Sequence, residues 1–170
     1  DILLDRQPAA VVQVADAKNL RRSLLIAVEL AETGIPFVLA VNMMDEAQAR
    51  GIEVDALQLG ERLGVPVVTT IATRKNGLAA LVGMLDEVRP GEIAIRYVPA
   101  LESAIAGIER LLPQDTPCAR GKAIMVLSGA DDLLDRLHLP AAEQAAIRVV
   151  RSQAEADVGQ PLSVAINRRR

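Results

Sequence analysis

Short apolar runs alternate with helical spacing along residues 9–89 of this chain. Runs of strand length occupy residues 10–15, 35–41 and 65–70, and each reads as a strand buried in a core. After each run, apolar residues recur with the period of one helix face. The order strand, helix, strand, helix, strand, helix favours right-handed crossovers. We therefore predict an α/β fold for residues 1–92, with a parallel sheet flanked by helices.

Capping and turn residues mark the ends of the three predicted helices. Asn19 is the expected N-cap of the first, and Gly34 follows its last apolar residue. Asp55 and Gln58 form a variant capping box that opens the second helix. A turn at Asn76 and Gly77, a third helix and a stop at Pro90 and Gly91 complete the pattern.

The pattern changes near residue 93, where helical spacing continues without further strand alternation. The apolar residues Leu101, Ile105, Ile108 and Leu112 lie on one helix face. The clearest loop in this part is the segment 113–117, which begins and ends with proline. We predict an all-helical subdomain over residues 93–170.

Composition limits the classes of partner. The chain is 51% hydrophobic, but its only aromatic residues are Phe37 and Tyr97, and its net charge is −3. Nucleic-acid binding normally uses a basic surface or aromatic stacking platforms, so we expect no nucleic-acid partner. The longest apolar region, residues 23–44, is interrupted by glutamates and a glycine, which argues against a membrane span.

The residue types that carry redox and metal chemistry are scarce. Cys118 is the single cysteine, so no internal disulfide can form, and a buried thiol in a reducing compartment is the simplest interpretation. His138 is the single histidine, and no Cys/His cluster suggests a metal site. No catalytic triad or thiol dyad is recognisable, so we name no catalytic residue and no metal ligand.

Asn42 and Asp45 follow the most apolar predicted strand and are the leading candidates for ligand contacts. Ligands of parallel sheets bind beyond the carboxyl ends of the strands. Guanine presents two parallel N–H donors on one edge, which one carboxylate can accept together, whereas adenine lacks this pair. The amide of Asn42 can donate and accept at once. A turn or a helix cap would also account for two polar residues at this spacing.

The loop after the next strand, residues 69–74, offers a second candidate contact. In guanine-binding domains this loop donates a backbone N–H to the oxo oxygen of the base, and Ala72 is placed to supply it. An ordinary strand-to-helix loop would look the same. Met43 has two interpretations as well, either core filler or a soft apolar contact with the purine face.

Phosphate and magnesium chemistry has no recognisable motif here. A phosphate-binding loop needs glycines with Lys and Ser/Thr, and a carboxylate must hold the metal. The segment Arg120–Ala123 contains Gly-Lys but lacks the preceding glycine and the hydroxyl. We expect Lys122 to be a solvated helix residue, and Asp131 and Asp132 to form a cap or a solvated face.

The chain resembles the cytosolic part of the ferrous iron transport protein B (FeoB) family. Three segments carry the resemblance: Val11–Leu20 (VVQVADAKNL), Gly34–Ala47 (GIPFVLAVNMMDEA) and Leu63–Val68 (LGVPVV). Guanine-nucleotide proteins in general have Lys after the Asn, whereas Met43 looks like this family's own version. The resemblance extends over essentially the whole chain, but to only the later part of the family's nucleotide domain.

The resemblance implies a GTPase of the P-loop type that binds GTP and GDP. Asn42 and Asp45 would read guanine, Met43 would flank it, and Ala72 would lie in the last base-contacting loop with Ile71 and Thr73 as neighbours. Ile71 replaces the small polar residue often found there. The phosphate loop, the switch regions and the Mg²⁺ ligands would precede Asp1, so we expect an inactive fragment with one sheet edge uncovered.

The resemblance also implies a biological setting. The family couples GTP binding and hydrolysis to Fe²⁺ uptake through its own membrane permease domain, at the cytoplasmic face of the bacterial inner membrane. Its helical domain is thought to modulate nucleotide release. By itself, this fragment would be soluble and cytoplasmic, and homo-oligomerisation stays open. The basic end, Arg168–Arg170, fits either a solvated terminus or attraction to the cytoplasmic leaflet.

Two alternatives from other classes remain. One is a soluble GTPase of the ribosome-assembly type, whose appended domain usually binds RNA. The helical, aromatic-poor second part of a chain whose net charge is −3 argues against it. The other is an interaction module that no longer binds nucleotide.

Overall fold

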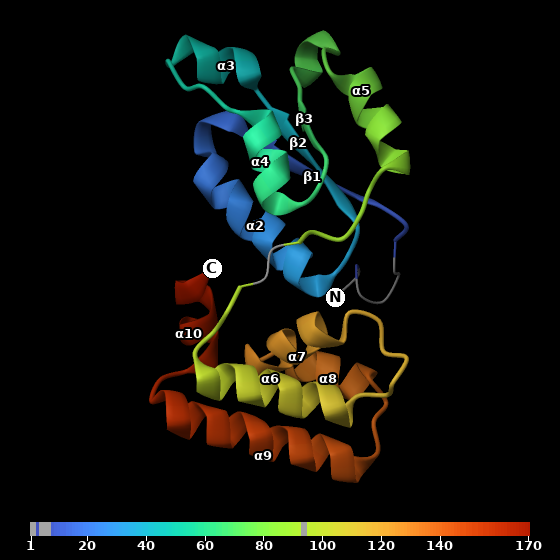
Figure 1. Cartoon of the computed structure of the whole chain (residues 1–170), viewed down its shortest axis with the longest axis vertical. Helices are drawn as coiled ribbons and strands as arrows, with labels where there is room; N and C mark the ends of the chain where they lie inside the picture. The colour runs from blue at the N-terminus through green and yellow to red at the C-terminus, as the bar shows by residue number, and fades with distance from the viewer. Residues whose placement is uncertain (1–2, 4–7, 93–94) are drawn as a thin grey trace. The chain divides into compact units, whose positions relative to one another are not determined.

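The computed structural model describes residue 3, residues 8–92 and residues 95–170. The chain divides into two compact units, Asp1–Ala94 and Ile95–Arg170 (Figure 1). The division lies two residues after the predicted boundary, and residues 93–94 are outside the described part.

The elements of the first unit are β1 (Val11–Asp16), η1 (Ala17–Asn19), α2 (Leu20–Thr33), β2 (Phe37–Asn42), α3 (Met44–Ala49), α4 (Ala56–Leu63), β3 (Val67–Thr69), η2 (Ala72–Arg74), α5 (Leu78–Gly83) and η3 (Met84–Asp86).

The first unit is built on a three-stranded parallel sheet in the order β1-β2-β3. The β1–β2 register runs from Val11 opposite Phe37 to Asp16 opposite Asn42. The β2–β3 register ends with Val41 opposite Thr69. The predicted fold class, a parallel sheet with flanking helices, is confirmed. All three strands therefore end at the same edge of the sheet.

The sheet has one well-covered face. Phe37, Leu39 and Val41 of β2 are fully buried and join one core cluster with residues of α2 and α4. β1 is different, because Val12 and Val14 on its other face are 42% and 65% exposed. The expectation that the first strand is buried is therefore wrong for one of its two faces. No helix among the described residues covers these two valines.

The ends of the helices follow the sequence signals in most places. Asp55 Oδ1 accepts the backbone N–H of Gln58 at 2.9 Å and caps α4. Gly34 ends α2 in the left-handed conformation. Asn19 stands at the N-cap of α2, but its side chain makes no capping bond. α5 is α-helical only to Gly83 and then tightens into a 3₁₀ turn, so it is shorter than its apolar spacing predicts.

The second unit is helical throughout its regular elements, as predicted. Ile105 and Ile108 are fully buried, and α6 packs against both α7 and α9. Lys122 on α7 is only 8% exposed, so the expectation of a solvated lysine is wrong. Among the described residues, no helix is long and apolar enough to cross a membrane. The elements are α6 (Pro99–Leu111), α7 (Ala119–Leu127), α8 (Asp131–Arg136), α9 (Ala141–Val158) and α10 (Leu162–Arg169).

One polar network fixes the start of the helical unit. Arg120 donates from both terminal nitrogens to the two carboxylate oxygens of Glu102, at 3.0 Å each. Glu102 also accepts the backbone N–H of Tyr97 at 2.9 Å, just before α6 begins. The Arg120 hydrogen bonds lower the pKa of Glu102 below its ordinary value, while partial burial opposes this effect. The Arg120 that looked like part of a phosphate motif thus has a structural role.

Candidate functional site

Polar residues follow all three strands at the carboxyl edge of the sheet. The segments are Asp16–Asn19 after β1, Asn42–Asp45 at the end of β2, and Thr69–Arg74 at the end of β3. Because the strands are parallel and in register, these segments are neighbours although they are separated in sequence. This is the edge at which parallel sheets bind ligands.

Asn42 is the hydrogen-bonding centre of this edge. Its Oδ1 atom accepts the hydroxyl of Thr70 at 3.1 Å and the backbone N–H of Ala72 at 3.0 Å. Since a backbone N–H can only donate, the amide oxygen must face Ala72, and this fixes the orientation of the amide group. The NH₂ group makes no hydrogen bond to the described residues, so it can donate to a ligand acceptor.

The backbone N–H of Ala72, which is predicted to donate to the base, has a protein acceptor in this structure. In this structure its N–H is already used by Asn42 Oδ1. Donation to a base oxygen would require this bond to be shared or replaced, so that role stays a prediction. Ile71 pairs with Asn76 through two backbone hydrogen bonds of 3.1 and 3.2 Å, and Thr73 is exposed on η2. These two residues shape the loop from opposite sides of Ala72.

Gly77 holds this loop against the end of β3. Its φ angle is +79°, and a Cβ atom built there would lie 2.2 Å from the backbone oxygen of Thr69. Neither the conformation nor the space admits a side chain. The Asn76–Gly77 turn therefore fixes the path of residues 69–76.

Met43 and Asp45 stand at the start of the short helix α3. Met43 has a left-handed backbone with φ 64° and a 38% exposed side chain. Asp45 Oδ1 accepts the N–H of Glu46 at 3.0 Å, and Oδ2 lies 3.5 Å from an Arg74 nitrogen. The Arg74 side chain is 70% exposed, and such contacts contribute little. Oδ2 of Asp45 thus has only a weak protein partner, whereas Oδ1 accepts a local backbone N–H.

Lys18 is a member of this edge that sequence reasoning missed. Its ammonium group pairs with Glu46, lies 3.4 Å from the sulfur of Met43, and lies 3.9 Å from Asp16. Its side chain is only 14% exposed. The available signal was its position directly after β1, because loops that follow neighbouring parallel strands meet at one edge.

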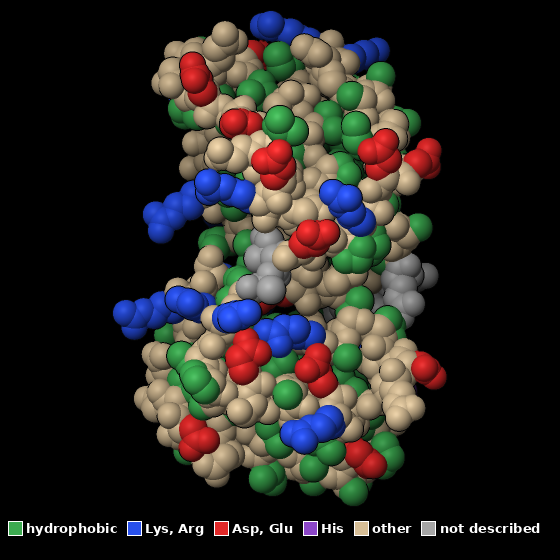
Figure 2. Space-filling view, viewed as in Figure 1, with side chains coloured by type: hydrophobic (Ala, Val, Ile, Leu, Met, Phe, Trp, Pro, Cys, Tyr) green, Lys and Arg blue, Asp and Glu red, His purple; other side chains and the backbone are tan. Residues whose placement is uncertain are grey.

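The side chains that hold metal ions are not gathered into a cluster in the described residues. These residues contain no group of three or more His, Cys, Asp or Glu side chains that could hold a metal ion. Acidic and basic side chains are interspersed on the visible face of each unit (Figure 2).

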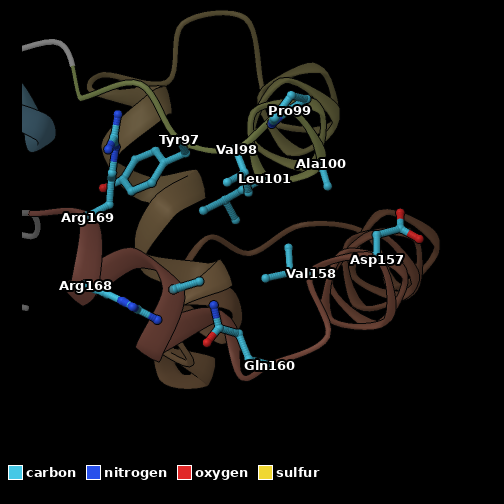
Figure 3. Close-up of a pocket in the computed structure, with 11 residues that line it drawn as sticks. Tyr97, Val98, Pro99, Ala100, Leu101, Asp157, Val158, Gln160, Arg168 and Arg169 are labelled. Carbon is cyan, nitrogen blue, oxygen red and sulfur yellow. The ribbon is translucent and has the colours of Figure 1, made fainter.

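The helical unit contains a cavity of its own, with a volume of about 450 Å³ (Figure 3). Its walls combine apolar residues such as Val98 and Val158 with Tyr97 and with Arg168 and Arg169 of the basic end. Arg169 Nε donates to the backbone oxygen of Arg96 at 3.1 Å. This exposed arginine therefore has one contact within its own unit. No sequence-predicted site residue lines the cavity.

Comparison with known proteins gives a consistent result. A family model described as ferrous iron transport protein B matches residues 1–85. The Fe(2+) transporter FeoB of Escherichia coli (strain K12) is 29% identical over 136 residues, which is 79% of this chain but 18% of that protein. The same-named protein of Salmonella typhimurium (strain LT2) is 41% identical over 76 residues, or 45% of this chain and 10% of that protein. The matched part is thus a small fraction of these relatives.

Solved structures extend the likeness to nearly the whole chain. NFeoB from S. thermophilus bound to GDP.AlF4⁻ and K⁺ is 30% identical with a TM-score of 0.85, and the match covers 99% of this chain and 68% of that one. The mGMPPNP-bound form of NFeoB from S. thermophilus is 30% identical with a TM-score of 0.84, covering 99% and 66%. The likeness therefore includes the helical unit as well as the sheet.

Proposed function

Because the chain belongs to the ferrous iron transport protein B family, we propose that its first unit is the base-reading part of a guanine-nucleotide-binding domain. The observation that carries the proposal is the arrangement of Asn42 and Asp45. Asn42 Oδ1 ties two loops together while its NH₂ group is left to donate. Asp45 lies at the same edge, and its charge is balanced only by a weak contact of Oδ2 with Arg74, while Oδ1 accepts the N–H of Glu46.

Asp45 gives the site its preference for guanine. Its two oxygens accept the ring N–H and the exocyclic NH₂ of guanine together, and adenine cannot offer this pair. Charge-assisted hydrogen bonds of this kind contribute about 1.5–3 kcal/mol each. The ion pair with Arg74 spans 3.5 Å at an exposed arginine, so the base displaces it at little cost.

The other predicted residues complete the contact with the base. Met43 lies against the purine face with its exposed, polarisable side chain. Ala72 supplies a backbone N–H to the oxo oxygen when the base competes with Asn42 Oδ1 for it. Ile71 and Thr73 flank this donor and set the path of the loop. The similar solved structures, which are named as bound to GDP.AlF4⁻ or mGMPPNP, support a guanine nucleotide as the ligand.

The wider function is proposed from the family. The whole protein binds and hydrolyses GTP and couples this to Fe²⁺ uptake by its membrane permease domain, at the cytoplasmic face of the bacterial inner membrane. Phosphate binding, Mg²⁺ binding and hydrolysis belong to segments outside this chain, which is inactive by itself. Residues 93–170 form the helical regulatory domain that modulates nucleotide release. The names of the curated relatives, Fe(2+) transporters, support this setting.

Asp45→Asn in the full-length product of the gene tests the base assignment. We expect GTP binding to weaken about a hundredfold, because the amide replaces an acceptor with a donor, and xanthosine triphosphate to become the preferred ligand. Asp55→Asn is the matched control, because it makes the same change at the cap of α4 and keeps a good N-cap residue. Competition titrations with GTP, ATP and xanthosine triphosphate measure the preference. An Asp45→Asn protein with unaltered preference contradicts the assignment.

The 170-residue chain gives a second test. We expect calorimetry with GDP to detect weak binding or none, because phosphate contacts normally supply much of the affinity. Micromolar or tighter binding would contradict the view that the phosphate-holding residues lie outside this chain.

A further inference from the structure

Lys18 brings an ammonium group to the base-reading edge from a different loop. We propose that Lys18 is a positioning residue of the guanine site: its ammonium group fixes Met43 and the first turn of α3 so that Asp45 faces the base. This inference rests on the proposed function and adds to the site a residue that the sequence motif does not contain. Lys18 and Met43 are 25 residues apart in the chain.

The contacts of Lys18 converge on the segment that must be held. Its Nζ atom donates to Glu46 Oε2 and lies 3.4 Å from Met43 Sδ. One ammonium group therefore contacts a residue before Asp45 and a residue after it in the chain. The side chain is only 14% exposed, in contrast to the 70% exposed Arg74 that contacts the carboxylate of Asp45. A half-buried ammonium with two partners restricts the loop far more than a solvated arginine does.

The segment needs external support because its own structure supplies little. Met43 is a non-glycine residue with φ 64°, a conformation that L-amino acids adopt at a cost. α3 spans only Met44–Ala49, and no side chain caps it. A helix this short is not stable by itself. Contacts from neighbouring loops therefore decide where Asp45 lies.

Lys18 is itself held in place from β1. Asp16 is the last residue of that strand, and its Oδ1 atom accepts the backbone N–H of Lys18 at 2.9 Å. The same carboxylate lies 3.9 Å from the ammonium group. Asp16 is paired in register with Asn42. The network thus connects the ends of two adjacent strands with the first turn of α3.

The arrangement also explains how a methionine can stand directly after Asn42. A thioether is a weak acceptor that can lie beside an ammonium group, whereas a lysine at position 43 would place a second positive charge against Lys18. The buried positive charge beside position 43 therefore comes from the loop after β1, and the apolar contact with the base comes from Met43.

Lys18→Met tests the role in the full-length product of the gene, with GDP as the probe. The variant keeps the length of the side chain and removes the charge, and we expect GDP binding to weaken about tenfold. Lys18→Arg keeps a charge that can reach Glu46, and we expect it to stay within about threefold of the unmodified protein. Arg21→Met is the matched control, because it removes one positive charge from an exposed position at the start of α2.

A spectroscopic readout separates positioning from general stability. The chain has four methionines, and Lys18→Met and Arg21→Met each add a fifth, so ¹³C labelling of the methionine methyl groups gives few signals, and Met43→Leu in each background assigns that of Met43. We expect Lys18→Met to move or broaden the Met43 signal while the melting temperature stays within about 2 °C, since partly exposed ion pairs stabilise the fold only slightly. Arg21→Met should leave this signal unchanged.

Each outcome has a defined meaning. A Lys18→Met protein that binds GDP with unaltered affinity, or that loses affinity no more than Arg21→Met does, overturns the role of Lys18 and leaves the base-reading proposal intact. An unmodified protein that binds GDP no better than ADP overturns the base-reading proposal, and the role of Lys18 falls with it. If Lys18→Met and Lys18→Arg lose GDP affinity equally and both melt at a much lower temperature, Lys18 stabilises the fold and does not position Asp45.

Discussion

The two units use the same pair of chemical groups, a carboxylate and a guanidinium, for opposite purposes. In the helical unit, Arg120 meets Glu102 through two hydrogen bonds of 3.0 Å, and Glu102 also accepts a backbone N–H. In the α/β unit, Asp45 also accepts one backbone N–H, from Glu46 at 3.0 Å, but Arg74 meets its other oxygen through one contact of 3.5 Å, and the arginine side chain is 70% exposed. The first pair is satisfied within the protein and fixes an element. The second leaves the carboxylate open to another partner.

The difference indicates how a structural polar group can be distinguished from a ligand-binding one in the same chain. A carboxylate whose acceptor sites are filled by well-placed donors gains nothing from a ligand. A carboxylate at a sheet edge with a weak partner can exchange that partner for a ligand without loss. Asp45 is of the second kind. It follows β2 at the carboxyl edge of the sheet, where the proposed ligand would replace Arg74 as its partner.

The core of the helical unit should respond most strongly to mutation. Ile105→Ala removes a fully buried side chain from the contact of α6 with α7 and α9, and we expect a loss of about 2–5 kcal/mol of unfolding free energy. Val149→Ala, at a 68% exposed position of α9, is the control and should change the unfolding free energy by less than about 0.5 kcal/mol. Denaturant unfolding measures both.

Ile105→Ala also tests whether the two units are independent of each other. If they are independent, amide signals of the β2 and β3 loops should stay unchanged in Ile105→Ala under native conditions. Shifts at Asn42 and Ala72 would instead reveal that the helical core supports the base-reading edge.

Gly77 should be the most sensitive single position of the α/β site. Gly77→Ala places a Cβ atom 2.2 Å from the Thr69 oxygen at a positive φ, and we expect a loss of about 2–3 kcal/mol together with displaced signals for Thr70 and Ala72. Gly83→Ala is the matched control, because no atom lies within 4 Å of its added Cβ. We expect that control to be stabilised by about 0.5–1 kcal/mol, since alanine favours helix. Equal effects of the two substitutions would contradict the role of the turn.

Glu102→Gln should have the smallest effect and a distinctive dependence on pH. The substitution weakens the charge-assisted bonds to Arg120, and we expect a loss of about 1–2 kcal/mol near neutral pH. The folded protein lowers the pKa of Glu102 below 4.5, so its stabilisation is complete above that pH. The stabilisation is lost as the pH falls through the lowered pKa, so the difference in stability between the two proteins should shrink as the solution is made more acidic.

Urea unfolding of both proteins between pH 3 and 7 measures this convergence. Glu109→Gln, a second glutamate of α6, serves as the control and should run parallel to the unmodified protein. A constant difference between Glu102→Gln and the unmodified protein across the whole range would contradict an ionised Glu102–Arg120 pair.

The sequence alone determined the sheet and the edge at which the candidate residues lie, because both follow from local patterns. Apolar runs of strand length with helices between them specify parallel strands, and parallel strands end at one edge. Asn42 and Asp45 were located in this way, as was the cap at Asp55. The change to helices near residue 93 is also a matter of periodicity, which needs no knowledge of distant contacts.

Tertiary structure decided which groups at that edge are occupied and which are available. The contacts of Lys18 with Met43 and Glu46 join loops that lie 25 and 28 residues apart, and no local pattern encodes them. The hydrogen bond between Ala72 and Asn42 spans 30 residues. It uses the backbone N–H of Ala72, which the sequence predicted to donate to a ligand. The burial of Lys122 likewise depends on neighbouring helices. Local periodicity specifies where a side chain is anchored, whereas its partners depend on segments that only folding brings together.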